Sequence, residues 1–312
     1  MNNPVIIDTD GGSDDTFCIG NMLRLHKLGK CNIIGITTVC GNIKSDECFQ
    51  TISILVKELF GINDIPIFES QSSAKFNNKC SYFYGEDGHY GKIKEISKKV
   101  YTSSESSESF LSRKLKEIDN LTIIAIGPLT NLHTCEQVET GILNKAKEIL
   151  IMGGAVKVDG NITPDNSTAD DSTAEYNFYI DEEATKSVLK CKNIVIFPLD
   201  ITHKLRFDIP KMIEKCSGIK FENFFKHIIS KIFSQSVKYN EVDPNDTKLI
   251  IHDVVVAIYY IRRDIFKVEN ERIVVGNKGN IKINENGNLI KVAYDCIDHK
   301  IANDILSEIF SI

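Results

Sequence analysis

The chain has 312 residues, with 37 Lys and Arg, 43 Asp and Glu, nine Cys, no Trp and a formal net charge of −6. This balance of 42% hydrophobic and 26% charged residues excludes a wholly disordered chain, and the acidic charge disfavours nucleic acid as a partner. No apolar run reaches the roughly 18 residues of a membrane-spanning helix, and the start lacks the basic segment of a secretory signal. Scattered Cys without a C-x-x-C pair indicate reduced thiols, so we expect a cytoplasmic protein without membrane partners.

Up to residue 200, short β-branched segments alternate with longer segments of helical periodicity. The predicted strands are Val5–Ile7, Asn32–Thr38, Leu121–Ile126, Glu148–Met152 and Asn193–Phe197. The predicted helices are Asp15–Leu28, Ser45–Phe60, Ser106–Ile118 and Asp181–Leu189. Continuously apolar strands that alternate with helices predict an α/β fold, with an open, mostly parallel twisted sheet and helices on both faces.

The pattern changes after Asp200, where two helical segments precede a run of strand-like segments. The expected helices are Phe221–Tyr239, His252–Ile265 and, at the end of the chain, Asp298–Ile309. The expected strands are Arg272–Val275, Gly279–Ile283 and Leu289–Tyr294, with a hairpin turn at Gly287-Asn288. No break in composition marks a boundary, so we expect one domain over residues 1–312.

Four carboxylates follow the first predicted strand, in the segment Asp8-Thr9-Asp10-Gly11-Gly12-Ser13-Asp14-Asp15. In open parallel sheets, ligands bind beyond the carboxyl ends of the strands. Such a cluster repels itself unless protons or a cation neutralise it, and hard oxygen ligands suit Ca²⁺ or Mg²⁺ better than Zn²⁺. Helix capping is the alternative explanation, but it leaves Asp8 and Asp10 unexplained at the end of a buried strand.

Two families of metal enzymes contain similar acidic segments. The D-x-D-G form resembles the haloacid dehalogenase phosphatases, in which Asp8 would be the nucleophile. The whole cluster, however, resembles the D-T-D-P-G-x-D-D signature of the inosine–uridine-preferring nucleoside hydrolases, and later motifs resemble that family in order. These motifs are Ile36–Asn42, Gly127–Leu132, Met152–Gly154, Gly160-Asn161, Ala174–Asn177 with Asp181, Leu199–His203 and His252-Asp253.

The resemblance implies an enzyme that hydrolyses the N-glycosidic bond of ribonucleosides through an oxocarbenium-like transition state. It implies one Ca²⁺ ion, with Asp10, Asp15, Asp253 and the main-chain carbonyl of Ile126 as ligands. Asp10 is then also the general base for the attacking water. His252 is the implied acid for the departing base, because histidine titrates near neutral pH.

The same resemblance assigns the ribose contacts and an assembly state. The implied substrate-binding residues are Asp14, Asn42, Asn161, Glu175 and Asn177. If this segment is extended, Glu175 and Asn177 lie on the same side of the chain. We interpret His203 and Asp200 as supporting residues rather than catalytic ones. The family also implies a homodimer or homotetramer that serves nucleoside salvage.

The chain departs from the family pattern mainly where the base would bind. Gly11 replaces a proline, and Tyr84 stands where the family often has a histidine. The segments Ile162–Ser172 and Tyr239–Lys248 are stretched, and without Trp the base must be held by other aromatic residues. The candidates are Phe83, Tyr84, Phe233 and Tyr239. A nucleoside- or ribose-binding protein with weak or lost turnover is therefore the alternative function.

Overall fold

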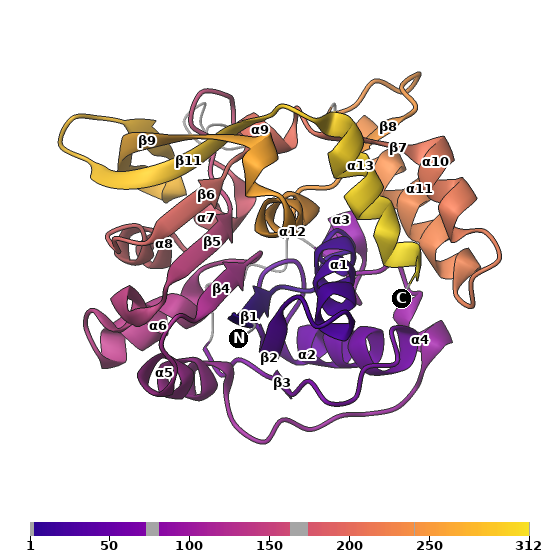
Figure 1. The fold of residues 1–312 in the computed structure, drawn as a ribbon, viewed down its shortest axis with the longest axis horizontal. Coiled ribbons are helices and arrows are strands. Elements are labelled where there is room, and N and C mark those ends of the chain that lie inside the picture. The colour runs from indigo at the N-terminus through magenta and orange to yellow at the C-terminus, as the bar shows by residue number, and fades with distance from the viewer. Residues whose placement is uncertain (1–2, 73–80, 163–173, 240, 312) are drawn as a thin grey trace.

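The computed structural model describes residues 3–72, 81–162, 174–239 and 241–311 of the chain. Among these residues, nine strands form one sheet in the order β10-β9-β11-β6-β5-β4-β1-β2-β3 (Figure 1). The first six are β1 (Pro4–Thr9), β2 (Asn32–Thr38), β3 (Ile67–Phe68), β4 (Thr122–Ala125), β5 (Glu148–Met152) and β6 (Ile194–Phe197). All neighbours among these six strands are parallel, which confirms the predicted fold class.

Consecutive residues of β1 point into two separate apolar cores, one on each face of the sheet. Val5 and Ile7 belong to the first core, and Ile6 between them belongs to the second. The first core is covered by α1 (Asp15–Lys27), α2 (Ser45–Ile54), α12 (Val254–Ile261) and α13 (His299–Ser307). The second is covered by α5 (Ser107–Glu117), α6 (Thr130–Val138) and α8 (Glu182–Val188). Because both faces are covered, the strands carry unbroken apolar runs.

The last three strands extend the sheet beyond β6 and add antiparallel pairs to it. β11 (Asn288–Cys296) pairs with β6 in parallel, and β9 (Phe266–Val275) pairs with β11 antiparallel. β10 (Ile281–Ile283) adds to the outer edge of β9. The predicted hairpin at Gly287-Asn288 is wrong, because β10 and β11 pair with opposite sides of β9 instead of with each other.

The connection from β10 to β11 passes very close to β9, which explains the glycine there. A Cβ atom on Gly287 would lie 2.5 Å from the carbonyl carbon of Ile273. No side chain fits such a gap, so the glycine reflects close backbone contact rather than a tight hairpin.

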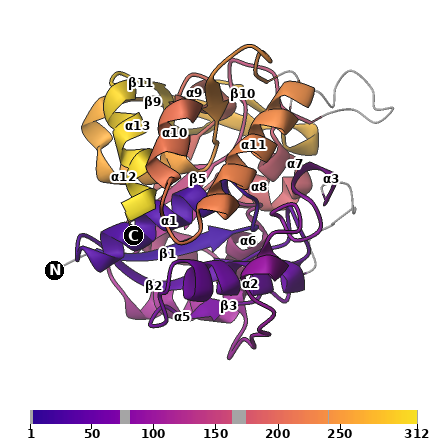
Figure 2. The same ribbon diagram turned by 90° about the vertical axis from the view of Figure 1, so that its right-hand side faces the viewer.

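An outer layer lies beyond α1 and α13, as the two views show (Figures 1 and 2). It contains α10 (Ile209–Cys216), α11 (Glu222–Lys238) and a two-stranded antiparallel sheet of β7 (Arg206–Asp208) and β8 (Lys248–Ile250). Phe225 of α11 packs against Phe17 of α1, with ring centroids 6.3 Å apart. This contact holds α11 against α1, the helix that follows the acidic loop.

Several predicted boundaries shift in the structure. The predicted helix Ser45–Phe60 is α2 followed by a π-helical turn at Leu55–Leu59. The predicted helix His252–Ile265 is shorter, since α12 ends at Ile261 and a single 3₁₀ turn follows at Arg263–Ile265.

The eight cysteines in the described residues are buried and unpaired, as expected of reduced thiols. No helix in the described part of the chain is long and apolar enough to cross a membrane.

Candidate active site

The acidic loop between β1 and α1 lies at the carboxyl end of β1, which pairs with β2 and β4 inside the sheet, and all four of its carboxylates are buried. Asp8 is the first of these acids and still belongs to β1. Its Oδ1 accepts hydrogen bonds from Thr37 Oγ1 at 2.6 Å and from Asn131 Nδ2 at 2.7 Å. Burial raises the pKa of Asp8 to about 7. These contacts join Asp8 to Thr37 of β2 and Asn131 of α6, so Asp8 stabilises the base of the acidic loop.

Asp10 is held by one residue of the next loop. Its Oδ2 accepts from the backbone N of Asn42 and its Oδ1 from the side-chain Nδ2 of Asn42, each at 2.9 Å. Burial, together with the charge of Asp15, raises the pKa of Asp10 well above its ordinary value. A Cβ on Gly41 would lie 2.2 Å from Asp10 Oδ2, so the neighbouring loop can approach only because it carries glycine there.

Asp14, Asp15 and Asp253 form a compact group of carboxylates within the acidic site. Asp253 directly precedes α12, so residues nearly 240 positions apart meet here; their oxygens lie within 4.8 Å of one another. Thr9 Oγ1 donates to Asp15 Oδ1, and the backbone N of Gly12 donates to Asp15 Oδ2 at 2.9 Å. Asp14 Oδ1 is buried without a hydrogen-bond partner.

This carboxylate group fits a divalent cation. Burial raises the pKa of Asp15 to about 7, and burial also raises the pKa of Asp253 well above its ordinary value. The described carboxylates therefore destabilise one another when charged, and an unpartnered oxygen on Asp14 points to a missing ligand. Oxygen donors alone suit a hard cation such as Ca²⁺ or Mg²⁺.

Gly11 stands where the family motif has a proline, and its backbone conformation is one that proline cannot adopt. Its φ is 76°, a left-handed value that proline cannot adopt, and a Cβ there would lie 2.9 Å from Cys48 Sγ. Ile126, the predicted main-chain ligand, directly follows β4. Its backbone N donates to the carbonyl of Asp8 at 2.8 Å, which fixes Ile126 beside the acidic loop.

The predicted ribose contacts on the chain's middle segment lie around the start of α7 (Tyr176–Ile180). The condition of an extended segment is not met, because a helix begins at Tyr176 and Glu175 is its N-cap. Its carboxylate accepts from the backbone N of Gly154 at 2.9 Å and of Asn177 at 2.9 Å. Capping a helix with a buried acid satisfies amide groups that would otherwise lack partners. Burial raises the pKa of Glu175 to about 7.

Asn161 and Asn177 also hold backbone in this region. Asn161 Oδ1 accepts from the backbone N of Tyr176 at 2.9 Å, and Asn177 Nδ2 donates to the carbonyl of Met152 at 3.3 Å. The Tyr176 hydroxyl donates to the carbonyl of Gly41 at 2.9 Å and so joins this segment to the Asp10 side of the site. Most of the predicted long insertion Ile162–Ser172 lies outside the described residues.

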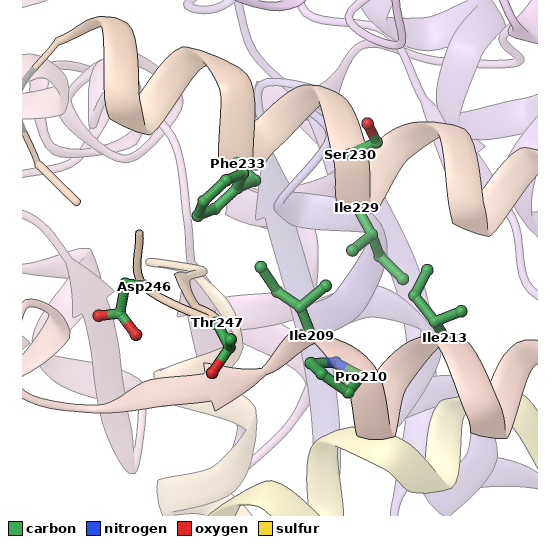
Figure 3. Close-up of a pocket in the computed structure, with 8 residues that line it drawn as sticks. All are labelled: Ile209, Pro210, Ile213, Ile229, Ser230, Phe233, Asp246 and Thr247. Carbon is green, nitrogen blue, oxygen red and sulfur yellow. The ribbon is translucent and has the colours of Figure 1, made fainter. Parts of the chain in front are cut away.

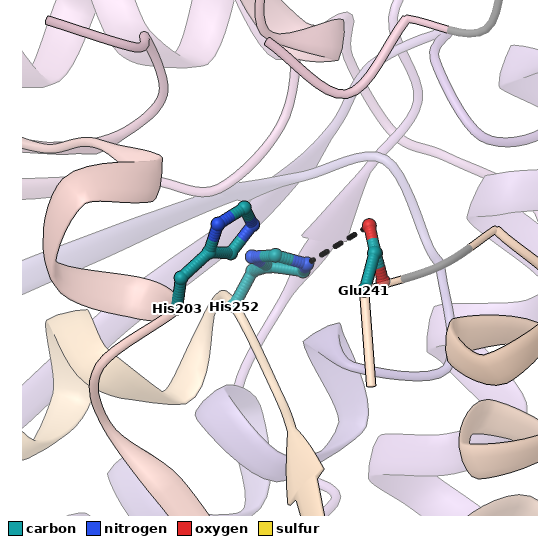
Figure 4. A group of neighbouring side chains, drawn as sticks. All are labelled: His203, Glu241 and His252. Atoms are coloured by element: carbon teal, nitrogen blue, oxygen red, sulfur yellow. Dashed lines mark ion pairs between the residues drawn. The ribbon is translucent and has the colours of Figure 1, made fainter. Parts of the chain in front are cut away.

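His252 lies near Asp14 of the acidic loop, in a group with His203 and Glu241 (Figure 4). Its Nδ1 is 2.8 Å from Thr202 Oγ1, and its Nε2 is 4.0 Å from Glu241 Oε1. Burial lowers the pKa of His252, and the nearby Asp14 charge opposes this effect. Asp200 accepts from the backbone N of Val156 at 2.8 Å.

Three of the four candidate aromatic residues gather at this end of the site. The rings of Phe83 and Tyr239 stack at 5.2 Å, and Tyr84 lies edge-on to Phe83 at 4.6 Å. A hydrogen bond from Tyr84 to Asp14 partly offsets the burial that raises the pKa of Asp14. Tyr84 therefore connects the aromatic group to the acidic one.

Phe233 instead lines a separate cavity of about 290 Å³ between α10 and α11 (Figure 3). The walls of this cavity are mostly apolar, with Ile209, Ile213 and Ile229 among them. It contains one acid, Asp246, which pairs with Arg206 at 3.0 Å. Without an unpaired acid or a histidine in its wall, this cavity offers no group for bond cleavage.

Sequence reasoning missed several residues that build the site. Thr37 and Asn131 lie inside two motifs quoted above, so their hydroxyl and amide groups were visible but had no assigned partner. Tyr176 likewise stands between two predicted contacts. Glu241 had no such signal, because it lies in the stretched segment Tyr239–Lys248, outside every quoted motif, and meets His252 only through the tertiary fold.

Comparison with known proteins agrees with these motifs. The family model described as inosine-uridine preferring nucleoside hydrolase matches residues 5–301. Uridine nucleosidase 1 of Arabidopsis thaliana is 29% identical over 291 residues, which cover 88% of this chain and 80% of that protein. The pyrimidine-specific ribonucleoside hydrolase RihB of Escherichia coli is 26% identical over 276 residues, covering 87% of this chain and 82% of that protein.

Solved structures show the same fold. A plant nucleoside hydrolase, PpNRh1, superposes with a TM-score of 0.83 at 23% identity, covering 99% of both chains. An inosine-uridine preferring nucleoside hydrolase from Bacillus anthracis gives 0.79 at 22% identity, again over 99% of both chains. The chain therefore belongs to the inosine-uridine preferring nucleoside hydrolase family, whose members are enzymes that act on N-glycosyl bonds.

Proposed function

We propose that this chain hydrolyses the N-glycosidic bond of ribonucleosides to ribose and free base, through an oxocarbenium-like transition state and with bound Ca²⁺. One observation carries the proposal: buried carboxylates from two distant segments, Asp14 and Asp15 on one side and Asp253 on the other, converge beyond the end of β1. Family membership supplies the reaction class, and the buried acids supply the reason for a hard cation.

Asp10, Asp15, Asp253 and the carbonyl of Ile126 would hold the cation. When bound, a divalent cation neutralises the acids, binds ribose hydroxyls and lowers the pKa of the attacking water. Asp10 would accept the proton of that water as the general base. Its two hydrogen bonds from Asn42 hold the carboxylate in a single orientation, which favours proton transfer from one position.

Polar side chains around the acidic loop would bind the sugar. Asp14 and Asn42 are proposed to contact ribose hydroxyls near the cation. Asn161, Glu175 and Asn177 are proposed to contact other parts of the ribose. A site that pairs hydroxyls with amides and carboxylates rejects analogues that lack those hydroxyls. Support comes from Tyr176, whose hydroxyl bond to Gly41 joins the Glu175 segment to the Asp10 loop.

His252 would protonate the departing base. Its Nδ1 contact with Thr202 fixes the ring, so that Nε2 is the nitrogen left to deliver a proton. Tyr84 would contact the base or the ribose, in the position where the family often has a histidine. Its contact with Asp14 supports a place at the border between the sugar and the base.

A phosphatase reaction is less well supported. The phosphatase resemblance rests on the D-x-D-G segment alone, whereas the nucleoside hydrolase family model matches residues 5–301. The proposed enzyme is a one-domain cytoplasmic homodimer or homotetramer of nucleoside salvage. Light scattering after size-exclusion chromatography tests the assembly state.

Reducing-sugar release from inosine and uridine tests the reaction itself. The proposal predicts release of ribose from at least one of the two nucleosides. Nucleoside binding without release would instead favour the alternative of a binding protein that has lost turnover. Hydrolysis of a phosphate ester by the intact chain, lost on Asp8→Asn substitution, would favour the phosphatase.

A further inference from the structure

A second group of possible metal ligands lies beside the acidic site. His203 follows α9 (Leu199–Thr202), Glu241 lies in the segment after α11, and His252 precedes Asp253. One ligand atom from each residue lies within 4.8 Å of the other two. In Figure 4 the two imidazole rings lie side by side, and the carboxylate of Glu241 faces the ring of His252.

The chemistry of these donors differs from that of the acidic loop. Asp14, Asp15 and Asp253 offer only hard carboxylate oxygens, which suit Ca²⁺. Two imidazole nitrogens with one carboxylate are instead a donor set that suits Zn²⁺ and similar transition-metal cations. The two groups would therefore select different cations.

The distance between His252 and Glu241 fits an intervening ion better than a direct contact. Nε2 and Oε1 are 4.0 Å apart, which is beyond hydrogen-bond range. Zinc bonds of about 2.0–2.2 Å place two ligand atoms of a tetrahedral site roughly 3–4 Å apart. Closing this pair onto a cation therefore needs a shift of less than about 1 Å, which two side-chain rotations supply.

The surroundings prepare both histidines as ligands. His252 Nδ1 and Thr202 Oγ1 lie 2.8 Å apart, and in the tautomer in which Nδ1 donates to this hydroxyl the lone pair is on Nε2, which faces Glu241. Metal-bound histidines generally have such a partner on the other ring nitrogen. His203 Nε2 is buried without a hydrogen-bond partner. The side chains of His252 and Glu241 are only 13% and 12% exposed, so water competes poorly for them.

We propose that His203, Glu241 and His252 form a second metal site, which binds a transition-metal cation of the Zn²⁺ class. Binding would use the Nε2 lone pair of His252. Only the consequence for turnover rests on the proposed function: a cation on Nε2 removes the nitrogen that would protonate the base, so Zn²⁺ would inhibit the enzyme while Ca²⁺ supports it.

Cobalt titration of the full chain, with Ca²⁺ at saturating concentration, tests the site without an activity assay. The proposal predicts one Co²⁺ per chain, with the visible absorption of tetrahedral cobalt, displaced by Zn²⁺. His203→Phe and Glu241→Gln should each weaken binding by about tenfold or more. His227→Phe is the matched control, because His227 on α11 also has an unpartnered Nε2 but lies outside the group, and it should bind like the intact chain.

The proposal is overturned if no tetrahedral cobalt absorption develops, or if both variants bind like the intact chain. Displacement of Co²⁺ by Ca²⁺ alone, or a thiolate charge-transfer band, would place the metal elsewhere and would also overturn it. If His203→Phe fails to fold, the result with Glu241→Gln decides. A chain that binds Co²⁺ but releases no ribose would keep this site and contradict the proposed function, so the two failures are distinguishable.

Discussion

At the scale of single residues, Asp10 and Asp8 show how two similar acids two positions apart acquire different roles. Asp8 points into the sheet, where Thr37 and Asn131 fix its Oδ1. Asp10 lies beyond the strand end, where Asn42 holds it by two hydrogen bonds and the charge of Asp15 acts on it. The first is therefore suited to support, and the second to proton transfer.

We expect Asp10→Ala to lower kcat for ribose release by about 10²–10⁴-fold, since the proposed general base and a proposed metal ligand are both lost. Circular dichroism should show that the fold survives, because Asp10 lies in a loop. Asp119→Ala, in an exposed turn, is the matched control and should leave kcat unchanged. Near-normal activity in the Asp10→Ala variant would refute its assignment.

The role of His252 predicts an effect that depends on the leaving group. His252→Ala should slow inosine and uridine hydrolysis strongly, because these bases leave poorly without a proton. An activated aryl riboside needs no proton on its leaving group, so its hydrolysis should be affected far less. Steady-state rates on both classes of substrate make the comparison, and equal losses would argue against the acid role.

At the scale of elements, the sequence predicted the parallel strands well, but it predicted the short elements and the longest strand poorly, since β9 runs from Phe266 to Val275 and only Arg272–Val275 was expected. β2 and β5 match their predicted bounds, because each is rich in isoleucine and mostly buried in the parallel part of the sheet. The two-residue β3 and the five-residue α7 were missed, since so few residues show no period of their own. Glu175 stabilises α7 as its N-cap. An N-cap residue can be recognised in a sequence only after the helix that follows it has been assigned.

The cap on α7 leads to a stability prediction. Glu175→Ala should lower the free energy of unfolding by about 1–3 kcal/mol, because it leaves the buried backbone N–H groups of Gly154 and Asn177 without an acceptor. Urea unfolding provides the measurement. Glu183→Ala, at an exposed position in α8, is the control and should change stability by about 0.5 kcal/mol or less. Equal stability of both variants would show that the cap contributes nothing.

The candidate site was predictable to the extent that its residues lie at strand ends. Asp10, Asp14 and Asp15 follow β1 directly, so the position of the acidic group could be expected from the strand pattern. Asp253 was expected from the family motif rather than from any pattern in its own segment. Glu241 could not be expected, because its approach to His252 depends on how α11 packs onto α1.

At the scale of the whole molecule, the outer layer is joined to the core through a buried histidine. His89 is fully buried, its Nε2 lies 2.6 Å from Thr16 Oγ1 of α1, and its ring stacks on Phe224 of α11. Burial lowers the pKa of His89 from 6.5 to about 4. The unfolded chain therefore takes up this proton at a higher pH than the folded chain does.

This shift predicts an acid sensitivity with a definite sign. The stability that comes from keeping His89 neutral is present above pH 6.5 and is lost as the pH falls towards about 4. The difference in unfolding free energy between the intact chain and His89→Phe should therefore shrink by about 2 kcal/mol between about pH 8 and about pH 5. Denaturant unfolding at several pH values measures it, with His299→Phe at an exposed position as the control. A difference that is independent of pH would refute the prediction.

The central claim is that the buried acids serve a calcium-dependent hydrolysis of ribonucleosides. The most direct test measures ribose release from inosine and uridine before calcium chelation, after chelation, and after Ca²⁺ is added back. The account predicts release that chelation abolishes and added Ca²⁺ restores, and no restoration in Asp15→Asn. Ribose release that continues unchanged in the calcium-free chain would contradict it.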